Sequence, residues 1–329
     1  MRSAMPSDGQ PDHDRPTGRD ADLLTDIATR FYLHGATQAD IAESLGLNPS
    51  TVSRHLKRAR DLGIVRFEIV PAAPPTADLG RQLAAAFGLS RAVVLPSGGP
   101  EQFAAAAAAF VSGQLRTGTR LGLGWGETLA SVIRNLVPGG VADLVVAQLA
   151  GGLREPAPGI QAHELAAQVA ALYPGSRVRY LHAPAIVDSA AIRAALAHDG
   201  SIAEALAAAA DAELALVGVG DVSDAATMFR HGEVAARDRA LLLAAGAVGS
   251  MNTRFFDGDG RPVDVLEDRT IALEWDQLRA IPTVVAIAAG PAKRAAIAGA
   301  LRSGAVDVLI TDQTTAVLLL SPVEVASGG

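Results

Sequence analysis

The chain has 329 residues, a length that favours two domains with sizeable hydrophobic cores. Its formal net charge of −7 excludes a protein that coats nucleic acid over its whole surface, but it is compatible with a small basic element on an acidic body. There is no cysteine, which excludes disulfides, thiolate zinc sites and cysteine nucleophiles. Hydrophobic residues make up 49% of the chain, yet no apolar run is long enough to cross a bilayer, so no membrane partner is expected.

Proline-rich and polar segments divide the chain. Residues 1–19 lack the apolar core of a signal peptide, so we expect a disordered leader on a cytoplasmic protein. Residues 71–75 contain three prolines and predict a stiff linker that no helix can cross. We therefore expect a small domain at 20–70, a large domain at 76–322 and a short tail at 323–329.

The small domain has the sequence pattern of three helices followed by a strand. Apolar residues recur at helical spacing in each helix. Thr37 stands at the N-cap of the second helix, Gly46 supplies the turn that follows it, and Asn48 is expected to cap the third helix, with Pro49 at its first position. Apolar and charged residues then alternate over residues 65–69, as in a strand with one solvated face. This order predicts a winged helix-turn-helix.

The third helix and the residues after it are basic. Residues 51–66 contain five arginines and lysines and one aspartate, a net charge of +4. Such a patch favours binding to the phosphates of double-stranded operator DNA. By position, the candidates for contacts to base edges are Ser50, Thr51, Ser53 and Arg54, and the candidates for phosphate contacts are Gln38, Lys57 and Arg58. The alternative is an ordinary helical hairpin with a solvated basic face.

The large domain alternates short apolar segments with alanine-rich helical segments. Several of these segments are continuously apolar, as expected for strands covered on both faces. The pattern predicts an α/β fold, with a doubly wound, mostly parallel, Rossmann-like sheet that binds ligands at the carboxyl ends of its strands. The expected strands are Ala92–Leu95, Arg120–Leu123, Asp143–Gln148, Val178–Leu181, Leu214–Val219, Val284–Ala288 and Val308–Thr311.

A glycine-rich segment follows the second expected strand and opens a helix. Glycines allow the backbone to approach a ligand closely, and a helix N-terminus offers free N–H groups to an anion such as a phosphate. The spacing matches neither a Walker P-loop nor the dinucleotide fingerprint. The alternative is a plain tight turn. The candidate effector-binding residues here are Gly122, Gly124, Trp125, Gly126, Glu127 and Thr128.

Further candidates lie at the ends of other strands and in a glycine-bounded loop over residues 246–257. In that loop Asn252, Arg254 and Asp257 are polar residues that could hydrogen-bond to sugar hydroxyls. The alternative is a purely structural role, in a turn held by Asx hydrogen bonds. Lys293, the only lysine of the large domain, lies near the start of a helix and is either a ligand contact or a surface residue. The remaining candidates are Gln148, Gly152 and Asp221.

From Tyr32 to Val65 the chain resembles the SorC family of bacterial sugar-responsive regulators, and the resemblance extends over residues 22–320. The glycine-rich segment resembles the family's sugar-binding loop, and residues 246–257 closely resemble a family signature. The resemblance places Lys293 at the ligand pocket, paired with a phosphate, and implies a homodimer or homotetramer. Two departures stand out: Asn48-Pro49 replaces a frequent Ser-Arg, and Ser250 replaces a frequent acidic residue.

The family's large domain also resembles sugar-phosphate isomerases, so an enzyme is the main alternative. Glu127, Asp221 and Asp257 are candidate bases, but nothing in the sequence pairs them into an acid/base set, and no metal-ligand cluster is evident. A large domain that only oligomerises is the third possibility. We therefore expect a transcription regulator without catalytic residues, metal or cofactor, controlled by a small, phosphorylated sugar.

Overall fold

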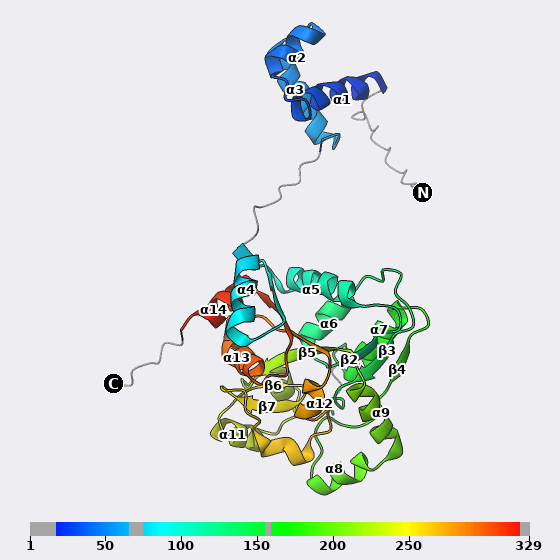
Figure 1. Cartoon of the computed structure of the whole chain (residues 1–329), viewed down its shortest axis with the longest axis vertical. Helices are drawn as coiled ribbons and strands as arrows, with labels where there is room; N and C mark the ends of the chain where they lie inside the picture. The colour runs from blue at the N-terminus through cyan, green and yellow to red at the C-terminus, as the bar shows by residue number, and fades with distance from the viewer. Residues whose placement is uncertain (1–17, 66–74, 155–158, 323–329) are drawn as a thin grey trace, which may run out of the picture. The chain divides into compact units, whose positions relative to one another are not determined.

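The computed structural model describes residues 18–65, 75–154 and 159–322 (Figure 1). Its contacts divide the chain into two compact units between Ala72 and Ala73, each with its own hydrophobic core. Four expectations fall outside the described residues: most of the leader, the wing strand from residue 66 onward, most of the linker, and the tail.

The N-terminal unit consists of three helices around a small apolar core. They are α1 Gly18–Tyr32, α2 Gln38–Leu45 and α3 Pro49–Asp61. Helix α1 begins inside the segment expected to be a leader. Each helix contributes fully buried side chains at the predicted helical spacing, namely Leu24, Ile27, Ala28, Ile41, Ala42, Val52, Leu56 and Ala59. This packing fixes which face of α3 is left exposed.

The caps of α2 follow the prediction, and that of α3 does not. The Thr37 hydroxyl accepts the Asp40 N–H, and the Asp40 carboxylate accepts the Thr37 N–H, which is a complete capping box. Gly46 ends α2 at φ 65°, a left-handed conformation that favours glycine. Asn48 has the extended backbone of an N-cap, but its side chain makes no capping hydrogen bond, so the expectation of a side-chain cap was wrong.

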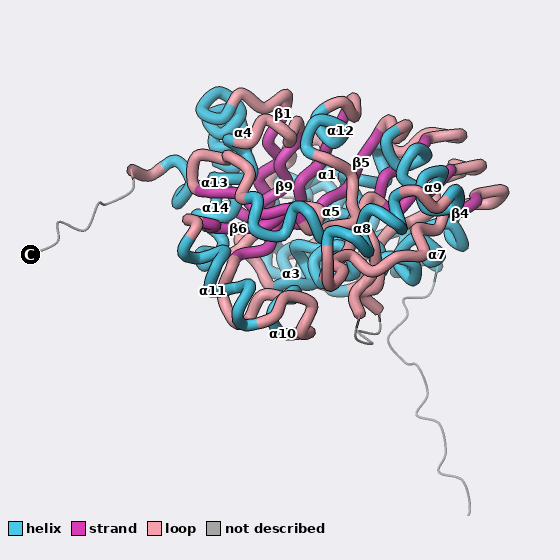
Figure 2. The backbone as a smooth tube through the Cα atoms, turned by 90° about the horizontal axis from the view of Figure 1, so that it is seen from below, coloured by secondary structure: helices cyan, strands magenta, loops and turns pink. Residues whose placement is uncertain are grey.

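The large unit is a doubly wound α/β domain. Seven parallel strands pair in the order β1-β9-β8-β5-β2-β3-β4. Figure 2 shows these strands running through the middle of the unit with helices over them. The strands are β1 Arg91–Leu95, β2 Arg120–Leu123, β3 Val145–Gln148, β4 Arg177–Arg179, β5 Leu214–Asp221, β8 Thr283–Ile287 and β9 Val308–Asp312.

Both faces of this sheet are covered, as the continuously apolar strands predicted. In β5, Leu214 and Leu216 pack into one core with α5, α6 and α7, whereas Ala215 and Val217 pack into the other with α4, α9 and α12–α14. The helices are α4 Pro75–Phe87, α5 Pro100–Gln114, α6 Glu127–Arg134, α7 Ala162–Leu172, α8 Ala190–Ala197, α9 Gly200–Ala210, α10 Thr227–Arg230, α11 Ala236–Ala244, α12 Trp275–Arg279, α13 Arg294–Arg302 and α14 Gln313–Leu320, with short 3-10 helices η1 Asp264–Arg269 and η2 Pro291–Lys293.

The segment expected to be a loop over residues 246–257 is a β-hairpin. Its strands are β6 Ala247–Met251 and β7 Arg254–Asp257, joined by the two-residue turn Asn252-Thr253. Strand β6 pairs antiparallel with the end of β5 and packs against α13 and α11. The glycines of this segment hid the strand pattern, because Gly249 is needed for close packing: a Cβ there would lie 2.6 Å from Ala296 Cβ.

Of the predicted strands, only Arg120–Leu123 has the observed boundaries, and the others differ by one or two residues at one or both ends. Strand β3 begins at Val145 rather than Asp143, because Asp143 has φ 59° and cannot continue a strand. Strand β4 covers only Arg177–Arg179 instead of Val178–Leu181. At the sheet edge the chain turns off after three paired residues, and the Leu181 N–H donates to the Gln148 side chain.

Arg254 lies at the centre of a buried ionic cluster that joins β7 to two neighbouring elements. Its side chain is fully buried and pairs with Glu267 of η1 and with Glu274, the N-cap residue of α12. The guanidinium also donates to the backbone oxygens of Leu273 and Ala272. Burial raises the pKa of the Glu267 carboxyl, and the Arg254 charge opposes that shift. The cluster ties the hairpin to the segment behind it.

Replacing Arg254 by methionine should destabilise the large unit by about 3 kcal/mol, because two carboxylates then lose a buried counter-charge. Urea unfolding followed by the fluorescence of the two tryptophans, both in the large unit, measures this. Arg261→Met is the matched control, since Arg261 is exposed and pairs with exposed Asp259, and it should change stability by less than about 0.5 kcal/mol. Equal stabilities for the two variants would contradict the structural role of Arg254.

Candidate functional site

The exposed face of α3 carries most of the residues predicted to contact DNA. Ser50, Ser53, Arg54, Lys57 and Arg58 are exposed, and Thr51 is half-buried at the start of the same helix. Gln38, at the first position of α2, is also half-buried. The structure therefore brings six of the seven candidates together on one helix, with the seventh at the start of the preceding one.

The positive charges on this face are available to a partner. Within the described part of the chain, none of Arg54, Lys57, Arg58 and Arg60 forms an ion pair. Arg54 lies along its own helix, where its guanidinium donates to the Ser50 carbonyl at 3.4 Å and the Thr51 hydroxyl at 3.2 Å. These contacts are weak and exposed, so the guanidinium can exchange them for contacts to bases or phosphates at small cost.

In the large unit, the glycine-rich segment forms a sharp turn between β2 and α6. Gly124 N–H donates to the Leu216 carbonyl of β5 at 2.9 Å, and a Cβ at Gly124 would lie 3.3 Å from that oxygen. Gly126 has φ 127°, which side chains rarely allow, and it is the N-cap of α6. The first turn of α6, whose N–H groups have no partner within the helix, therefore follows directly after a glycine-lined bend.

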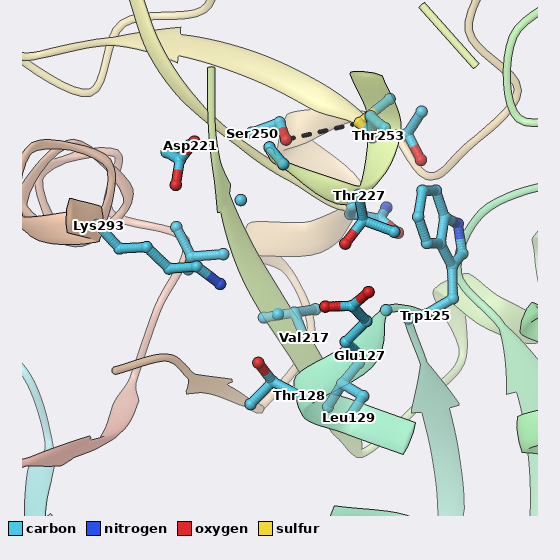
Figure 3. A pocket seen from close by; sticks show the side chains of 18 of the residues that line it. Trp125, Glu127, Thr128, Leu129, Val217, Asp221, Thr227, Ser250, Thr253 and Lys293 are labelled. Carbon is cyan, nitrogen blue, oxygen red and sulfur yellow. Dashed lines mark hydrogen bonds between the residues drawn. The ribbon is translucent and has the colours of Figure 1, made fainter. Parts of the chain in front are cut away.

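This turn borders a pocket of about 330 Å³ at the carboxyl ends of β2 and β5, a size suited to a small molecule. Figure 3 shows side chains from α6, β5, the hairpin and η2 around it. Eight predicted effector-binding residues line it, namely Gly124, Trp125, Gly126, Glu127, Thr128, Asp221, Asn252 and Lys293.

Lys293 and Asp221 form the charged side of the pocket. The Lys293 ammonium points into the pocket, toward the side that carries Glu127 and Thr128 (Figure 3). Burial lowers the pKa of Lys293, and the Asp221 carboxylate opposes that shift. Asp221 also accepts the Ser223 N–H at 2.8 Å. The pocket thus holds a partly desolvated ammonium beside the start of α6, an arrangement that attracts an anion.

Glu127, the first residue of α6, is paired rather than free. Its carboxylate forms an ion pair with Arg230 of α10. This pair neutralises a negative charge that would repel an anion at the helix start. Sequence analysis did not identify Arg230, because a four-residue helix has no periodic pattern to mark it.

Five predicted effector-binding residues lie elsewhere. Gly122 is inside β2, where a Cβ would lie 2.6 Å from a Leu149 methyl, so its role is packing. Arg254 is in the buried ionic cluster described above. Asp257 accepts the N–H groups of Asp259 and Arg261, so it forms the Asx-type turn that was the alternative prediction for this segment. Gln148 and Gly152 line a second cavity of about 730 Å³, beside Gln161 and His163.

The pocket also contains residues that the sequence analysis missed. One set precedes and includes α10, namely Ser223, Ala225, Ala226, Thr227 and Met228. Thr253, in the hairpin turn, is another of these residues. A two-residue turn flanked by alternating residues is a hairpin signal that was available in the sequence, but the second position is a threonine where this signal normally has glycine.

The described residues show no features of two other classes of site. No three histidines, aspartates or glutamates among them are grouped so that they could hold a metal ion. None of the helices in the described part of the chain combines the length and apolarity needed to span a membrane.

Comparison with known proteins matches both units. Residues 74–321 match the family described as "Putative sugar-binding domain", and residues 35–66 match winged helix-turn-helix DNA-binding domains. The chain is 31% identical over 309 residues to the transcriptional regulator LsrR of Klebsiella pneumoniae, covering 91% of this chain and 93% of that protein. It is 30% identical over 306 residues to the deoxyribonucleoside regulator of Bacillus subtilis, covering 91% and 97%.

A solved structure supports the same relationship. The full-length sorbitol operon regulator SorC of Klebsiella pneumoniae superposes with a TM-score of 0.69 at 28% identity, covering 92% of this chain and all of that one. The two domain matches, the curated relatives and this likeness agree with the sequence motifs. The chain therefore belongs to the SorC family of sugar-binding transcriptional regulators.

Proposed function

We propose that this chain binds operator DNA through α3 and that a phosphorylated sugar in the pocket between α6, the hairpin and η2 changes that binding. The observation that carries the proposal is the Lys293 ammonium, partly desolvated and directed toward the start of α6. An ammonium and free helix N–H groups together form a phosphate site. The polar hairpin residues in the same pocket suit sugar hydroxyls.

The pocket is proposed to bind its ligand without turnover. Of the three candidate bases, Glu127 is ion-paired with Arg230, and Asp257 holds a turn outside the pocket lining. Asp221 accepts a backbone N–H and lies close enough to Lys293 to influence its pKa. These carboxylates are thus engaged in structural or charge-balancing roles, which supports sensing rather than proton transfer.

The relatives support the proposed regulatory role. LsrR and the deoxyribonucleoside regulator are named as regulators, and SorC as the regulator of a sorbitol operon. We propose that this chain acts in the cytoplasm as a homodimer or homotetramer on a carbohydrate operon. Symmetry would then set two α3 helices about one DNA turn apart, or a multiple of it. A coupling of about 1–3 kcal/mol between ligand and DNA is sufficient for control.

Arg54→Ala and Lys57→Ala should weaken DNA binding in different ways. A contact from Arg54 to a base edge predicts a loss of roughly 1–3 kcal/mol on a duplex selected from a random library by the full-length protein, with little loss on a scrambled duplex. Lys57, as a phosphate contact, should weaken both about equally and lower the salt slope by about 1.

Fluorescence anisotropy at several salt concentrations separates the two effects. Arg177→Ala, on exposed strand β4, is the matched control and should bind like the wild type. Unchanged affinity of Arg54→Ala and Lys57→Ala for the selected duplex would show that α3 is not the recognition helix.

Affinity for a phosphorylated ligand should fall with rising pH, and the fall should begin below the ordinary pKa of a lysine. Burial holds the pKa of Lys293 below its ordinary value, so the free pocket loses its positive charge earlier than an exposed lysine would. Bound phosphate favours the charged ammonium, so binding takes up a proton wherever the free lysine is neutral. The affinity is therefore full below the lowered pKa and decreases by up to about tenfold per pH unit above it.

Calorimetric titration between about pH 7.5 and 10 measures this profile, since the phosphate itself is fully ionised in that range. Lys293→Arg is the matched control, because arginine stays charged throughout and should give a flat profile. The quantity compared between the wild type and Lys293→Arg is the slope of ligand affinity against pH, not the affinity itself. A wild-type profile as flat as that of Lys293→Arg would remove Lys293 from the anion site.

A further inference from the structure

The turn of the hairpin has an unusual residue at its second position. Asn252 and Thr253 have φ 51° and 67°, both in the left-handed region, in a two-residue turn between paired Met251 and Arg254. Turns of this geometry favour asparagine followed by glycine. Threonine is β-branched and is strained in this conformation, since its Cβ crowds the backbone. The chain therefore has a threonine at a position whose backbone conformation favours glycine.

The side chains of this turn carry buried polar atoms without partners. Asn252 is 8% exposed and Thr253 is 4% exposed. Asn252 Nδ2 donates to the Leu149 carbonyl at 3.2 Å, which fixes the amide and leaves Oδ1 unpaired. Neither Asn252 Oδ1 nor Thr253 Oγ1 has a hydrogen-bond partner among the residues that the structure describes. Leaving such atoms unpaired in a protein interior is unfavourable, so a bound group that pairs with them is expected.

Both residues line the pocket, and Thr253 lies on a different side of it from Lys293. In Figure 3, Thr253 lies in the hairpin turn, on the side of the pocket that carries Trp125, whereas Lys293 enters from the opposite side. A ligand whose phosphate lies at Lys293 and the start of α6 would therefore extend its remote end toward the turn. Asn252 Oδ1 can only accept a hydrogen bond, whereas the Thr253 hydroxyl can donate or accept. A hydroxyl satisfies both, since it can donate to Asn252 Oδ1 and accept from the Thr253 hydroxyl.

We propose that Thr253, with Asn252, recognises a hydroxyl at the end of the effector remote from its phosphate, an inference that rests on the proposed function. The pair makes the pocket selective for phosphorylated sugars or polyols that keep this hydroxyl. A deoxy analogue leaves the two oxygens unpaired and is rejected, because a site built to hydrogen-bond a hydroxyl discriminates strongly against its loss. The strained threonine is then kept at this position because its hydroxyl is needed to recognise the ligand.

The test uses the full-length chain, with calorimetric titration of glucose 6-phosphate, ribose 5-phosphate, sorbitol 6-phosphate and inorganic phosphate. Thr253→Val keeps the branched shape and removes the hydroxyl, whereas Thr253→Ser keeps the hydroxyl. Thr253→Val should lose roughly tenfold in affinity for the sugar phosphate that binds the wild type best. Thr253→Ser should stay within about threefold of the wild type, and inorganic phosphate should bind all variants alike.

Thr253→Gly separates recognition from stability. It relieves the backbone strain, so it should melt at the wild-type temperature or a few degrees higher, yet it should lose affinity for the sugar phosphate as Thr253→Val does. Asp143→Gly is the matched control, since Asp143 also has a left-handed backbone, at φ 59°, but is exposed and outside the pocket. It should leave all affinities unchanged.

The outcomes distinguish this inference from the proposed function. Wild-type affinity for the sugar phosphate in both Thr253→Val and Thr253→Gly overturns the role of Thr253 and leaves the proposed function standing. A loss of inorganic phosphate binding equal to the loss of sugar phosphate binding also overturns it, because the effect would then be a general distortion of the pocket. Failure of the wild type to bind any of the sugar phosphates overturns the proposed function and this inference together.

Discussion

The parallel pairing of β2 with β5 creates the pocket, because β5 extends beyond its neighbour. Strand β2 ends at Leu123, opposite Leu216, whereas β5 continues to Asp221. Past that point the chain turns at Gly124, held by a hydrogen bond to Leu216, and the last three residues of β5 pair with β6. Helix α6 and the hairpin both border the pocket beside the end of β5. Most of the pocket lining follows from this difference in strand length.

The hairpin shows how stability and recognition are divided between adjacent residues. Arg254 is fully buried and satisfied by two carboxylates and two backbone oxygens, so it anchors the start of β7. The two residues before it carry buried oxygens without partners and a strained backbone. Such strain persists only where the surrounding structure holds it in place. The ionic cluster supplies that support immediately beside the turn.

Sequence reasoning was most successful where local chemistry determines structure. The period of the three N-terminal helices, the N-cap at Thr37 and the turn at Gly46 all follow from short-range rules and were found. The continuously apolar strands predicted a sheet covered on both faces, and Gly124–Thr128 was placed correctly between a strand and a helix. These features depend on neighbours in the sequence, which a pattern can reveal.

The remaining features depend on partners distant in the sequence. Arg254 has the chemistry of a sugar contact, but its carboxylate partners lie 13 and 20 residues away, and nothing local indicates that they enclose it. Gly122 resembles its neighbours in the glycine segment, yet Leu149 from the adjacent strand makes it a packing residue. Arg230 reaches Glu127 from a four-residue helix. In each case a tertiary contact assigns the role.

The central claim is that occupancy of the pocket changes the affinity of the protein for DNA. The most direct measurement is the dissociation constant for a selected duplex, by anisotropy, with and without a saturating sugar phosphate that calorimetry has shown to bind. The account predicts a change of at least about fivefold in the wild type, which is the smallest coupling typical of allosteric control, and none when Lys293 is replaced by methionine. A sugar phosphate that fills the pocket and leaves the affinity for DNA unaltered would contradict it.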